Sequence, residues 1–575
     1  MKFTNITIKN FRNFENISVD LGNKNVFFGM NDIGKTNFLY AIRYLFDRDA
    51  RRYDLVDSDY HKRKTSTPIE ITVSIDISEN DTDTQKLRAK LKGNIGSDDT
   101  MVFIRLTAEY SEQESRGNIL LSWGNEVNKL TEMKSSGSSF DIDYVFNVYY
   151  INSYVDLHDL FKKNLNSLIK KDEDKIDADK EAELAIEAKV DEINCEIAKL
   201  SGVRKFESKL TPSYKKMRNE DISITIKSDF AINYLYSNIA PYIHKDGETD
   251  EYPTQGEGRK KLVAYPVYNI LAEDTTEKKI NLFLIEEPET HLHRSMQSAL
   301  SHFLFDSNAN DNMLNYLFIS THSPLVLSDM DDVNLVRIYN SDKIVSNSEF
   351  YSVPGEWKDI KKKLNRALSE AIFADAVILV EGESECILFE RVLSSIDPYY
   401  ESKGIYVIAV EGVNFKPYIK VLSKLGIKYV AKTDNDITKV PKSKPNIYQT
   451  LGFSRVNSLI AELDSTPTIT LPTETNLPKR ATGARAKKER YNVNKSIIDS
   501  INNTYGIFLS RCDLETDLYE CLGRRLSTIM GKNPVKVLKS SKQYKMVELA
   551  SQLTLSDCQK IYEHKNFACL KAVRQ

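Results

Sequence analysis

The stretch Asp375–Glu385 reads DAVILVEGESE and joins a short apolar run to a cluster of carboxylates. The run Val377–Val380 is too short to span a membrane and is typical of a buried parallel strand. Glu381 follows it directly, and Gly382 permits the sharp exit by which a strand turns into a helix. Such a helix would hold Glu381 and Glu385 one turn apart, at the strand end where ligands bind in open α/β sheets. The two acids could therefore share a hard cation.

Two further strand-like runs, at 427–433 and 507–509, also end in acidic residues. The acids are Asp434 and Asp436 after the first run, and Asp513, Glu515 and Asp517 after the second. Alternation along an extended chain puts the first pair on one side. Three runs that all end in carboxylates are hard to explain as solvated faces. We therefore expect these acids to meet at one edge of a sheet.

Carboxylates that gather at one edge of a sheet could hold one or two divalent ions. For the first ion we assign Glu381, Asp434 and Asp436, and for the second Glu385, Asp513 and Glu515. All six are hard oxygen ligands, which suit two Mg²⁺ or Mn²⁺ ions and exclude a thiolate zinc site.

The sequence GMNDIGKT at Gly29–Thr36 follows a predicted strand at Asn25–Phe28 and precedes apolar residues at helical spacing. This is the context of a phosphate-binding loop. Backbone N–H groups would cradle the phosphates of ATP, Lys35 would reach the β and γ oxygens, and the Thr36 hydroxyl would hold Mg²⁺. The residues predicted to bind the nucleotide here are Gly29, Asn31, Asp32, Ile33, Gly34, Lys35, Thr36 and Asn37.

Two later strands supply the rest of the nucleotide site. Leu282–Ile285 is an apolar run that ends in Glu286 and Glu287, a Walker B pattern. Glu286 would order the magnesium through water, although aspartate is usual there, and Glu287 would act as general base. Tyr316–Ile319 is the next apolar run and ends in STHSP. Its His322 resembles the switch histidine of ABC-type ATPases, which contacts the γ-phosphate.

ABC-type ATPases also need a signature loop, and the best candidate is TQGEGRKK at Thr254–Lys261. Gln255 stands at the usual serine position, and Pro266 should kink the helix behind the loop. These departures put ATP hydrolysis, rather than ATP binding, in question. His291 and His293 are not assigned to metal, because ABC-type ATPases have their subunit-contact loop there.

The rest of the N-terminal half contains two segments with different hydrophobic patterns. Strict alternation at Ile69–Ile77 predicts an antiparallel sheet with one wet face. Glu181–Leu200 predicts a charged helix with a narrow apolar stripe, which could lie on its own domain or contact another subunit. We place a helical insertion at about 155–220, and a boundary between domains 1–347 and 348–575.

Composition limits the function classes. The 575 residues carry a net charge of −3, so affinity for nucleic acid must come from local basic patches. Residues 521–546 contain seven basic residues and no acid, and residues 479–490 contain six basic residues and one acid. No leader and no run of membrane-span length is visible, which predicts a cytoplasmic protein. Six cysteines without a CxxC pair indicate neither zinc nor disulfides, and we expect reduced, buried thiols.

The motifs VEGESE, TDND and DLETDL resemble the Toprim fold of topoisomerases, primases and nucleases. An ABC-type ATPase followed by a Toprim domain is the layout of the OLD (overcoming lysogenization defect) family. The resemblance extends over nearly the whole chain, through KNFRNF, LIEEPE, HRSMQ and FACLK. It implies an α/β protein, in which an ABC-type P-loop ATPase domain with a helical dimerisation insertion precedes a Toprim domain.

This resemblance implies a metal-dependent endonuclease of bacterial antiphage defence that acts on double-stranded DNA. It also implies a homo-oligomer, dimer or tetramer, formed through the ATPase half, and a UvrD-like helicase as partner. Lys542, in LKSSKQYKMVEL, matches the lysine that such nucleases place beside their metals. The predicted catalytic residues are Glu381, Asp434, Asp436, Asp513, Lys542 and Glu287. Two complete sites in one chain suggest that nucleotide regulates cleavage, and we favour nucleotide as the restraint.

Two other readings stay open at this point. One is an SMC- or RecF-like DNA-binding ATPase whose acidic clusters are structural. The other is a topoisomerase that uses one of the 30 tyrosines as nucleophile, although no tyrosine is singled out.

Overall fold

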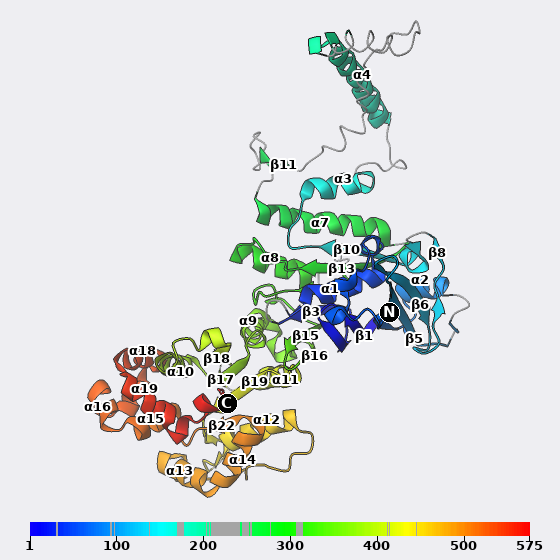
Figure 1. The fold of residues 1–575 in the computed structure, drawn as a ribbon. Coiled ribbons are helices and arrows are strands. Elements are labelled where there is room, and N and C mark those ends of the chain that lie inside the picture. Colours follow the sequence, from blue (N-terminus) through cyan, green and yellow to red (C-terminus); the bar gives the residue numbers. More distant parts are fainter. Residues whose placement is uncertain are drawn as a thin grey trace.

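The computed structural model describes residues 1–29, 33–91, 95–96, 98–136, 139–168, 177–202, 204–205, 208, 242–243, 252–253, 256–276, 278–305, 314–410, 412, 414–443 and 445–574. Figure 1 shows two sheets in the N-terminal half and a third sheet, surrounded by helices, in the C-terminal half. No helix among these residues is long and apolar enough to cross a membrane.

The first sheet is antiparallel, with strand order β2-β1-β4-β5-β6-β7. Its strands are β1 (Lys2–Phe11), β2 (Phe14–Asp20), β4 (Ile69–Asp76), β5 (Met101–Ser111), β6 (Arg116–Gly124) and β7 (Thr131–Glu132). Alternate residues of β4 are buried and half-buried, which confirms the predicted sheet with one wetter face. The helix α2 (Thr82–Lys90) connects β4 to β5.

The second sheet has the order β10-β13-β14-β3-β15-β16 and is parallel except for its last strand. Its strands are β3 (Lys24–Phe28), β10 (Phe146–Ile151), β13 (Ile280–Glu286), β14 (Tyr316–Ser320), β15 (Val333–Asn340) and β16 (Ile344–Tyr351). The three strands predicted around the nucleotide site are confirmed as β3, β13 and β14. In β13 all residues but the last are buried, because the sheet is covered on both faces.

The two faces of the second sheet belong to different cores. Leu282 and Leu284 face the first sheet and α1 (Lys35–Phe46), in a core rich in phenylalanine. Phe283 and Ile285 face the opposite way, toward α7 (Glu257–Thr276) and α8 (Arg294–Phe305). Alternate residues of β13 thus pack into two different hydrophobic cores, one on each face of the sheet.

The predicted insertion at 155–220 falls partly outside the described residues. Its described helices are α3 (Leu157–Leu168) and α4 (Asp177–Lys199), and α4 projects away from the sheets in Figure 1. In the predicted apolar stripe, Ile186 and Ile193 of α4 and Leu200 just after it are exposed, whereas Val190 is buried. Pro266 lies inside α7, which continues past it to Thr276, so the proline does not end this helix.

The third sheet is parallel throughout, with the order β18-β17-β19-β22. Its strands are β17 (Ala376–Val380), β18 (Ile405–Ala409), β19 (Lys428–Thr433) and β22 (Ile507–Leu509). The helices around it are α9 (Lys361–Ile372), α10 (Glu383–Ile396), α11 (Lys416–Lys424), α12 (Leu451–Leu463), α13 (Ala484–Val493), α14 (Lys495–Tyr505) and α15 (Leu514–Leu522). Further helices follow at α16 (Arg524–Met530), α17 (Pro534–Ser540), α18 (Lys542–Gln552), α19 (Leu555–Glu563) and α20 (Cys569–Ala572).

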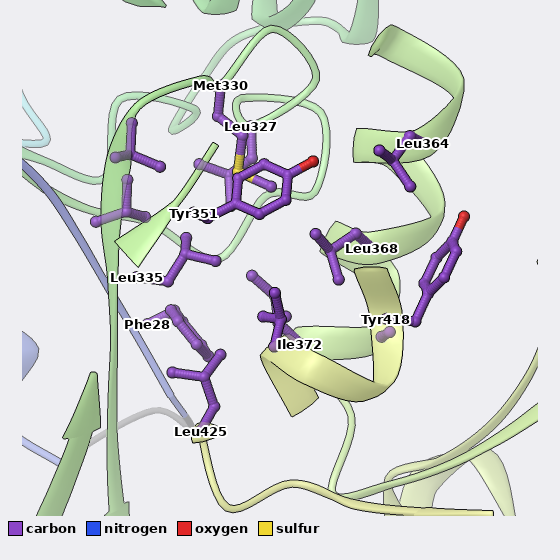
Figure 2. Packing of buried hydrophobic residues seen from close by; sticks show 14 of the residues in the cluster. Phe28, Leu327, Met330, Leu335, Tyr351, Leu364, Leu368, Ile372, Tyr418 and Leu425 are labelled. Carbon is purple, nitrogen blue, oxygen red and sulfur yellow. The ribbon is translucent and has the colours of Figure 1, made fainter. Parts of the chain in front are cut away.

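One hydrophobic cluster runs from the second sheet into the third without interruption. Figure 2 shows Phe28 and Leu335 of the second sheet beside Ile372 of α9 and Leu425, which follows α11. Burying one such side chain completely stabilises the fold by about 1.5–3 kcal/mol. The two halves therefore share a core.

The predicted boundary at 347 lies inside β16, and the second sheet ends later, at Tyr351. The hydrophobic pattern of the sequence does not reveal this strand. It is an edge strand with many polar residues, and most of its side chains are half-buried. No disulfide joins the cysteines. Four of the six are buried, whereas Cys521 is half-buried and Cys195 is exposed.

Candidate metal and nucleotide sites

The acidic residues that follow three parallel strands come together at the carboxyl edge of the third sheet. Glu381 follows β17, Asp434 follows β19, and Asp513 stands after β22 at the start of α15. Burial raises the pKa of Asp434 well above its usual value, and the charges of Glu381, Glu385, Asp436 and Asp513 raise it further. Four other predicted ligands thus lie close enough to Asp434 for their charges to act on it.

Glu381 is held firmly through one oxygen. Its Oε1 accepts hydrogen bonds from Thr433 Oγ1 at 2.6 Å, from the Asp434 backbone N–H at 2.9 Å and from the Arg455 guanidinium at 2.5 Å. The same guanidinium donates to Asp436 Oδ2 at 3.0 Å. Arg455 therefore bridges carboxylates that follow two different strands.

Glu385 lies in the first turn of α10, and burial raises its pKa to about 7, with a further contribution from the negative charge of Glu381. A carboxyl group with such a pKa is partly protonated at neutral pH. It can lose this proton when a cation arrives.

Asp513 and Asp517, both in the third acidic cluster, have different roles. Asp513 caps α15 by accepting from the Thr516 backbone N–H, and Lys539 Nζ lies 2.6 Å from its Oδ2. Burial works to raise the pKa of Asp513, but the hydrogen bonds from Lys539 and Thr516 lower it overall. Asp517 accepts from the backbone N–H groups of residues 511 and 512, so it shapes the loop rather than facing the cluster.

Glu515 is the residue whose surroundings best fit a bound cation. Only 1% of it is exposed, and its Oε2 is buried with no hydrogen-bond partner among the described residues. Its Oε1 lies 3.9 Å from Lys542 Nζ. An orphaned buried carboxylate oxygen is costly, and a hard cation would satisfy it.

The donor set fits Mg²⁺ or Mn²⁺ chemically, since all six carboxylates offer oxygen. Within the described ranges, however, no three His, Cys, Asp or Glu side chains converge closely enough to hold an ion as they stand. Positive side chains are paired with these acids instead: Arg455 with Glu381 and Asp436, and Lys539 with Asp513. The metal assignment stays a prediction.

In the nucleotide site, the structure brings the phosphate-binding loop against the Walker B strand. Thr36 Oγ1 donates to Glu286 Oε1 at 2.5 Å, and the Tyr150 hydroxyl donates to Glu286 Oε2. Lys35 is buried and donates to the carbonyl oxygen of Gly29 at 3.0 Å. Of the other predicted loop residues, Asn31 and Asp32 lie outside the described residues.

The remaining loop residues pack locally. Gly34 has φ +107°, and a side chain there would collide with Asn13. Ile33 is buried, and Asn37 contacts Asn13 and Arg12. Gly34 therefore has to be glycine for the loop to turn into α1.

Glu287 and His322 face each other, with His322 Nε2 lying 3.5 Å from Glu287 Oε1. Glu289 stabilises the loop that carries His322. Its carboxylate accepts hydrogen bonds from the His322 backbone N–H at 2.6 Å and from Thr321 Oγ1 at 2.8 Å. Burial and then the charge of Lys35 lower the pKa of His322. These two effects favour the neutral imidazole.

Lys261 of α7 reaches into this site, although the sequence does not single it out. It is 2% exposed, and its Nζ donates to the carbonyl oxygens of Glu287 at 2.7 Å and Ser153 at 3.1 Å. Glu287 has φ +42°, an uncommon conformation for a residue with a side chain. Lys261 thus fixes the backbone of the predicted general base.

The predicted signature loop is only partly described, since Thr254 and Gln255 lie outside the described residues. Gly258 lies in the first turn of α7, where a Cβ would come within 2.6 Å of the His291 carbonyl oxygen. Gly258 therefore permits the start of α7 to lie close to the backbone of His291 in the same chain. His293 Nδ1 lies 3.0 Å from Ser295 Oγ.

Several residues of the two basic patches are paired with acids. Arg525 pairs with Asp557 and Lys545 with Glu548. In residues 479–490, the side chains of Arg485, Lys488 and Arg490 all have acidic partners. The field that each patch presents to solvent is thus weaker than its sequence suggests.

Sequence reasoning missed Arg455, Lys261, Tyr150 and Glu289. Lys261 and Glu289 are the last residues of TQGEGRKK and LIEEPE, whereas Tyr150 and Arg455 lie in no quoted motif, and all four act by reaching a distant segment. A signal that could have pointed to Arg455 is that it is the single basic residue of the apolar helix LGFSRVNSLIAEL.

Comparison with known proteins agrees with this arrangement. A family model described as "AAA ATPase domain" matches residues 1–146 and 74–327, and one described as "Overcoming lysogenization defect protein-like, TOPRIM domain" matches residues 372–436. Endonuclease GajA of Bacillus cereus (strain VD045) is 43% identical over 99% of both chains. The OLD nuclease of Thermus scotoductus is 25% identical over 28% of this chain and 32% of its own.

Two solved structures are also similar. The C-terminal region of the Burkholderia pseudomallei OLD protein is 22% identical, covers 35% of this chain and 98% of its own, and gives a TM-score of 0.25. The SMC head domain from Thermotoga maritima is 12% identical, covers 61% and 100%, and gives 0.28. At these scores the fold assignment rests on the family models and the sheet topology.

The fold and its two sites define an AAA-class ATPase domain joined to a C-terminal OLD-like Toprim domain, which confirms the predicted α/β fold class. Within that class, the chain belongs to the family of Endonuclease GajA.

Proposed function

We propose that this protein is a divalent-metal-dependent DNA endonuclease of bacterial antiphage defence, and that ATP bound in its N-terminal half controls the Toprim nuclease. Its family membership supports nuclease activity. The observation that carries the metal-dependent reading is the meeting of Glu381, Asp434 and Asp513 after three parallel strands. Arg455 and Lys539 offset part of the repulsion among these acids, and a divalent cation would offset the rest.

In this proposal Glu381, Asp434 and Asp436 hold one ion, and Glu385, Asp513 and Glu515 hold a second. When bound, two Mg²⁺ or Mn²⁺ ions supply an activated water and neutralise charge on the leaving oxygen. The protein's own contribution is to gather the oxygens and exclude bulk water from the half-buried cluster.

Lys542 is the side chain best placed to act on the phosphate itself. Burial works to lower its pKa, but Glu515, Asp434, Glu385 and Asp513 raise it overall, so Lys542 stays charged. A fixed ammonium beside the scissile phosphate would stabilise the extra charge of the transition state. Double-stranded DNA would reach the site across the basic residues of 521–546, where Arg524, Lys532 and Lys536 show no acidic partner in the described chain.

Nucleotide control is supported by the shared core. The strand that leads into the phosphate-binding loop ends at Phe28, which contacts Phe373 just ahead of β17, the strand that leads to Glu381. A nucleotide that favours one arrangement of the loop can therefore favour one arrangement of the carboxylates. We propose that bound ATP restrains cleavage and that its depletion releases it.

The assembly we propose is a homo-oligomer, dimer or tetramer, formed through the ATPase half in the bacterial cytoplasm. The exposed apolar stripe of α4 is consistent with a subunit contact. A UvrD-like helicase, GajB of the Gabija defence system, is the proposed partner, by analogy with the GajA family.

Incubation of supercoiled plasmid with the purified protein tests the proposal. We expect nicking or cutting that needs Mg²⁺ or Mn²⁺, is lost in Glu381→Gln, and is suppressed by millimolar ATP. Lys35→Ala should keep cleavage but lose its suppression by ATP. Glu383→Gln is the matched control, since Glu383 is an exposed acid at the start of α10, two residues after Glu381.

The outcomes separate the competing functions. Cleavage that is identical from zero to millimolar ATP would refute the regulation and leave the nuclease. If Glu381→Gln has no effect in any assay while Lys35→Ala abolishes function, the protein is an SMC- or RecF-like DNA-binding ATPase with a structural Toprim domain. A covalent protein–DNA adduct that survives detergent would indicate a topoisomerase.

A further inference from the structure

Arg455 is almost completely enclosed beside the predicted metal ligands. It is 8% exposed, and its two terminal nitrogens have different partners. One donates to Glu381 Oε1 and to Thr433 Oγ1, both at 2.5 Å, and the other donates to Asp436 Oδ2 at 3.0 Å. A guanidinium cannot lose its charge in a protein, so Arg455 is a donor at every working pH.

These contacts use only one oxygen of each carboxylate. Glu381 Oε1 has three donors, while Glu381 Oε2 and Asp436 Oδ1 accept no hydrogen bond from the described residues. The fork of the guanidinium therefore fixes both side chains and leaves one oxygen of each for a cation. Lysine could not do this, because a single ammonium lacks the planar pair of donors.

The start of α12, the helix that carries Arg455, packs closely against the loop 434–436. Gly452, one turn earlier in α12, donates from its N–H to the Asp436 carbonyl oxygen at 2.9 Å. A Cβ at Gly452 would come within 2.7 Å of the Asp434 carbonyl oxygen and 2.8 Å of the Asp436 nitrogen. This close approach holds the start of α12 against the loop 434–436 and limits how far Arg455 can move.

We propose that Arg455 is a positioning residue for the first metal ion: it orients Glu381 and Asp436, which follow two different strands, so that their remaining oxygens face one cation. This inference rests on the proposed metal-dependent function and adds to it a residue that touches no metal. Partners that orient metal ligands in this way typically change metal affinity by roughly 10- to 100-fold.

Direct measurement of Mn²⁺ binding, without DNA or ATP, tests the inference. We expect Arg455→Ala to weaken binding of the first ion by roughly 10- to 100-fold. Arg455→Lys should fall between that variant and wild type, because it keeps the charge but cannot bridge both carboxylates. The matched control is Arg391→Gln, since Arg391 donates to the backbone carbonyls of Ala550 and Leu553 and contacts no predicted ligand. It should bind Mn²⁺ as wild type does.

Chemical rescue provides a readout that a merely structural role would not give. A hollow of about 460 Å³ lies beside Arg455, lined in part by Trp357, Lys420 and Ser458. Millimolar ethylguanidinium should enter through it and restore Mn²⁺ binding to Arg455→Ala, but not to Glu381→Gln. If Arg455→Ala fails to fold, Thr433→Val removes another donor to Glu381 Oε1 and should weaken Mn²⁺ binding to a smaller degree.

The failures are distinguishable. Wild-type protein that binds no Mn²⁺ overturns the proposed function itself. Wild-type protein that binds Mn²⁺, together with folded Arg455→Ala that binds it equally well, overturns only the role of Arg455. Tighter binding by Arg455→Ala also overturns it, because Arg455 would then compete with the ion.

Discussion

Phe28 packs edge to face against Phe373, with ring centroids 5.7 Å apart and an interplanar angle of 76°. Phe28 ends the strand that enters the phosphate-binding loop, and Phe373 follows α9 just before the strand that leads to Glu381. Phe28 belongs to the hydrophobic cluster that the two halves share (Figure 2), and Phe373 packs against that cluster. In the proposed regulation, this contact would carry the effect of ATP to the carboxylates.

Phe373→Ala should weaken the influence of ATP on cleavage. Loss of the edge-to-face contact should also cost on the order of 1–3 kcal/mol of unfolding free energy. The measurement is an ATP titration of plasmid nicking, with unfolding in denaturant as the stability check. Phe350→Ala is the control, because Phe350 is 55% exposed on β16. The coupling role is wrong if ATP changes cleavage by the same factor in Phe373→Ala and in wild type.

Lys542→Ala should lower the cleavage rate by roughly 100-fold or more at saturating Mn²⁺, because it removes the charge that would face the phosphate. Mn²⁺ affinity should stay the same or rise, since a positive neighbour of Glu515 is lost. Single-turnover cleavage and Mn²⁺ titration separate the two effects. Lys560→Ala, an exposed lysine of α19, should behave as wild type. A variant that loses metal binding and cleavage together would point to a structural role for Lys542.

The metal-free protein should lose stability as the pH rises from about 4.5 through 7. The pKa of Glu385 is raised to about 7 in the folded chain from an unfolded value near 4.5, chiefly by burial. A raised pKa means that the folded state binds the proton more tightly, so its stabilisation is complete below pH 4.5 and is lost above 7. The loss is on the order of 1–3 kcal/mol.

Chemical denaturation in the presence of a chelator, at several pH values, measures this loss. Glu385→Gln should reduce the pH dependence without abolishing it, because burial also raises the pKa of Asp434, and Glu383→Gln should leave it unchanged. With Mn²⁺ present, binding should tighten as the pH rises through 7, because the ligand must lose its proton. Equal pH dependence in wild type and Glu385→Gln would show that the group titrates elsewhere.

Lys261→Met should weaken nucleotide binding and destabilise the fold by roughly 2–4 kcal/mol, since two buried carbonyl oxygens lose a charged donor. Burial lowers the pKa of Lys261 to about 8, which reflects how little water reaches it. Fluorescent ATP-analogue binding and thermal unfolding test both effects. Lys260→Met, at the neighbouring and more exposed position, should change neither. Unaltered nucleotide affinity in a folded Lys261→Met protein would contradict the role given to Lys261.

The amino-acid sequence by itself determined the strands and the chemistry at their ends. Apolar runs at 282–285, 316–319 and 377–380 became β13, β14 and β17, because a continuous apolar run has to be buried on both faces. The sequence also indicated which acids would gather, since parallel strands end at a common edge. Family resemblance then gave the order of the two domains, which the comparisons confirm.

Tertiary structure alone decided what holds those groups in place. Arg455, Lys261 and Glu289 act on partners many residues away, and no local pattern encodes such a pairing. The shared core between the halves was also invisible, because periodicity tells which face of a strand is buried but not against which element. For the same reason the predicted boundary fell inside β16: polar edge strands carry little hydrophobic signal, and only pairing with β15 reveals them.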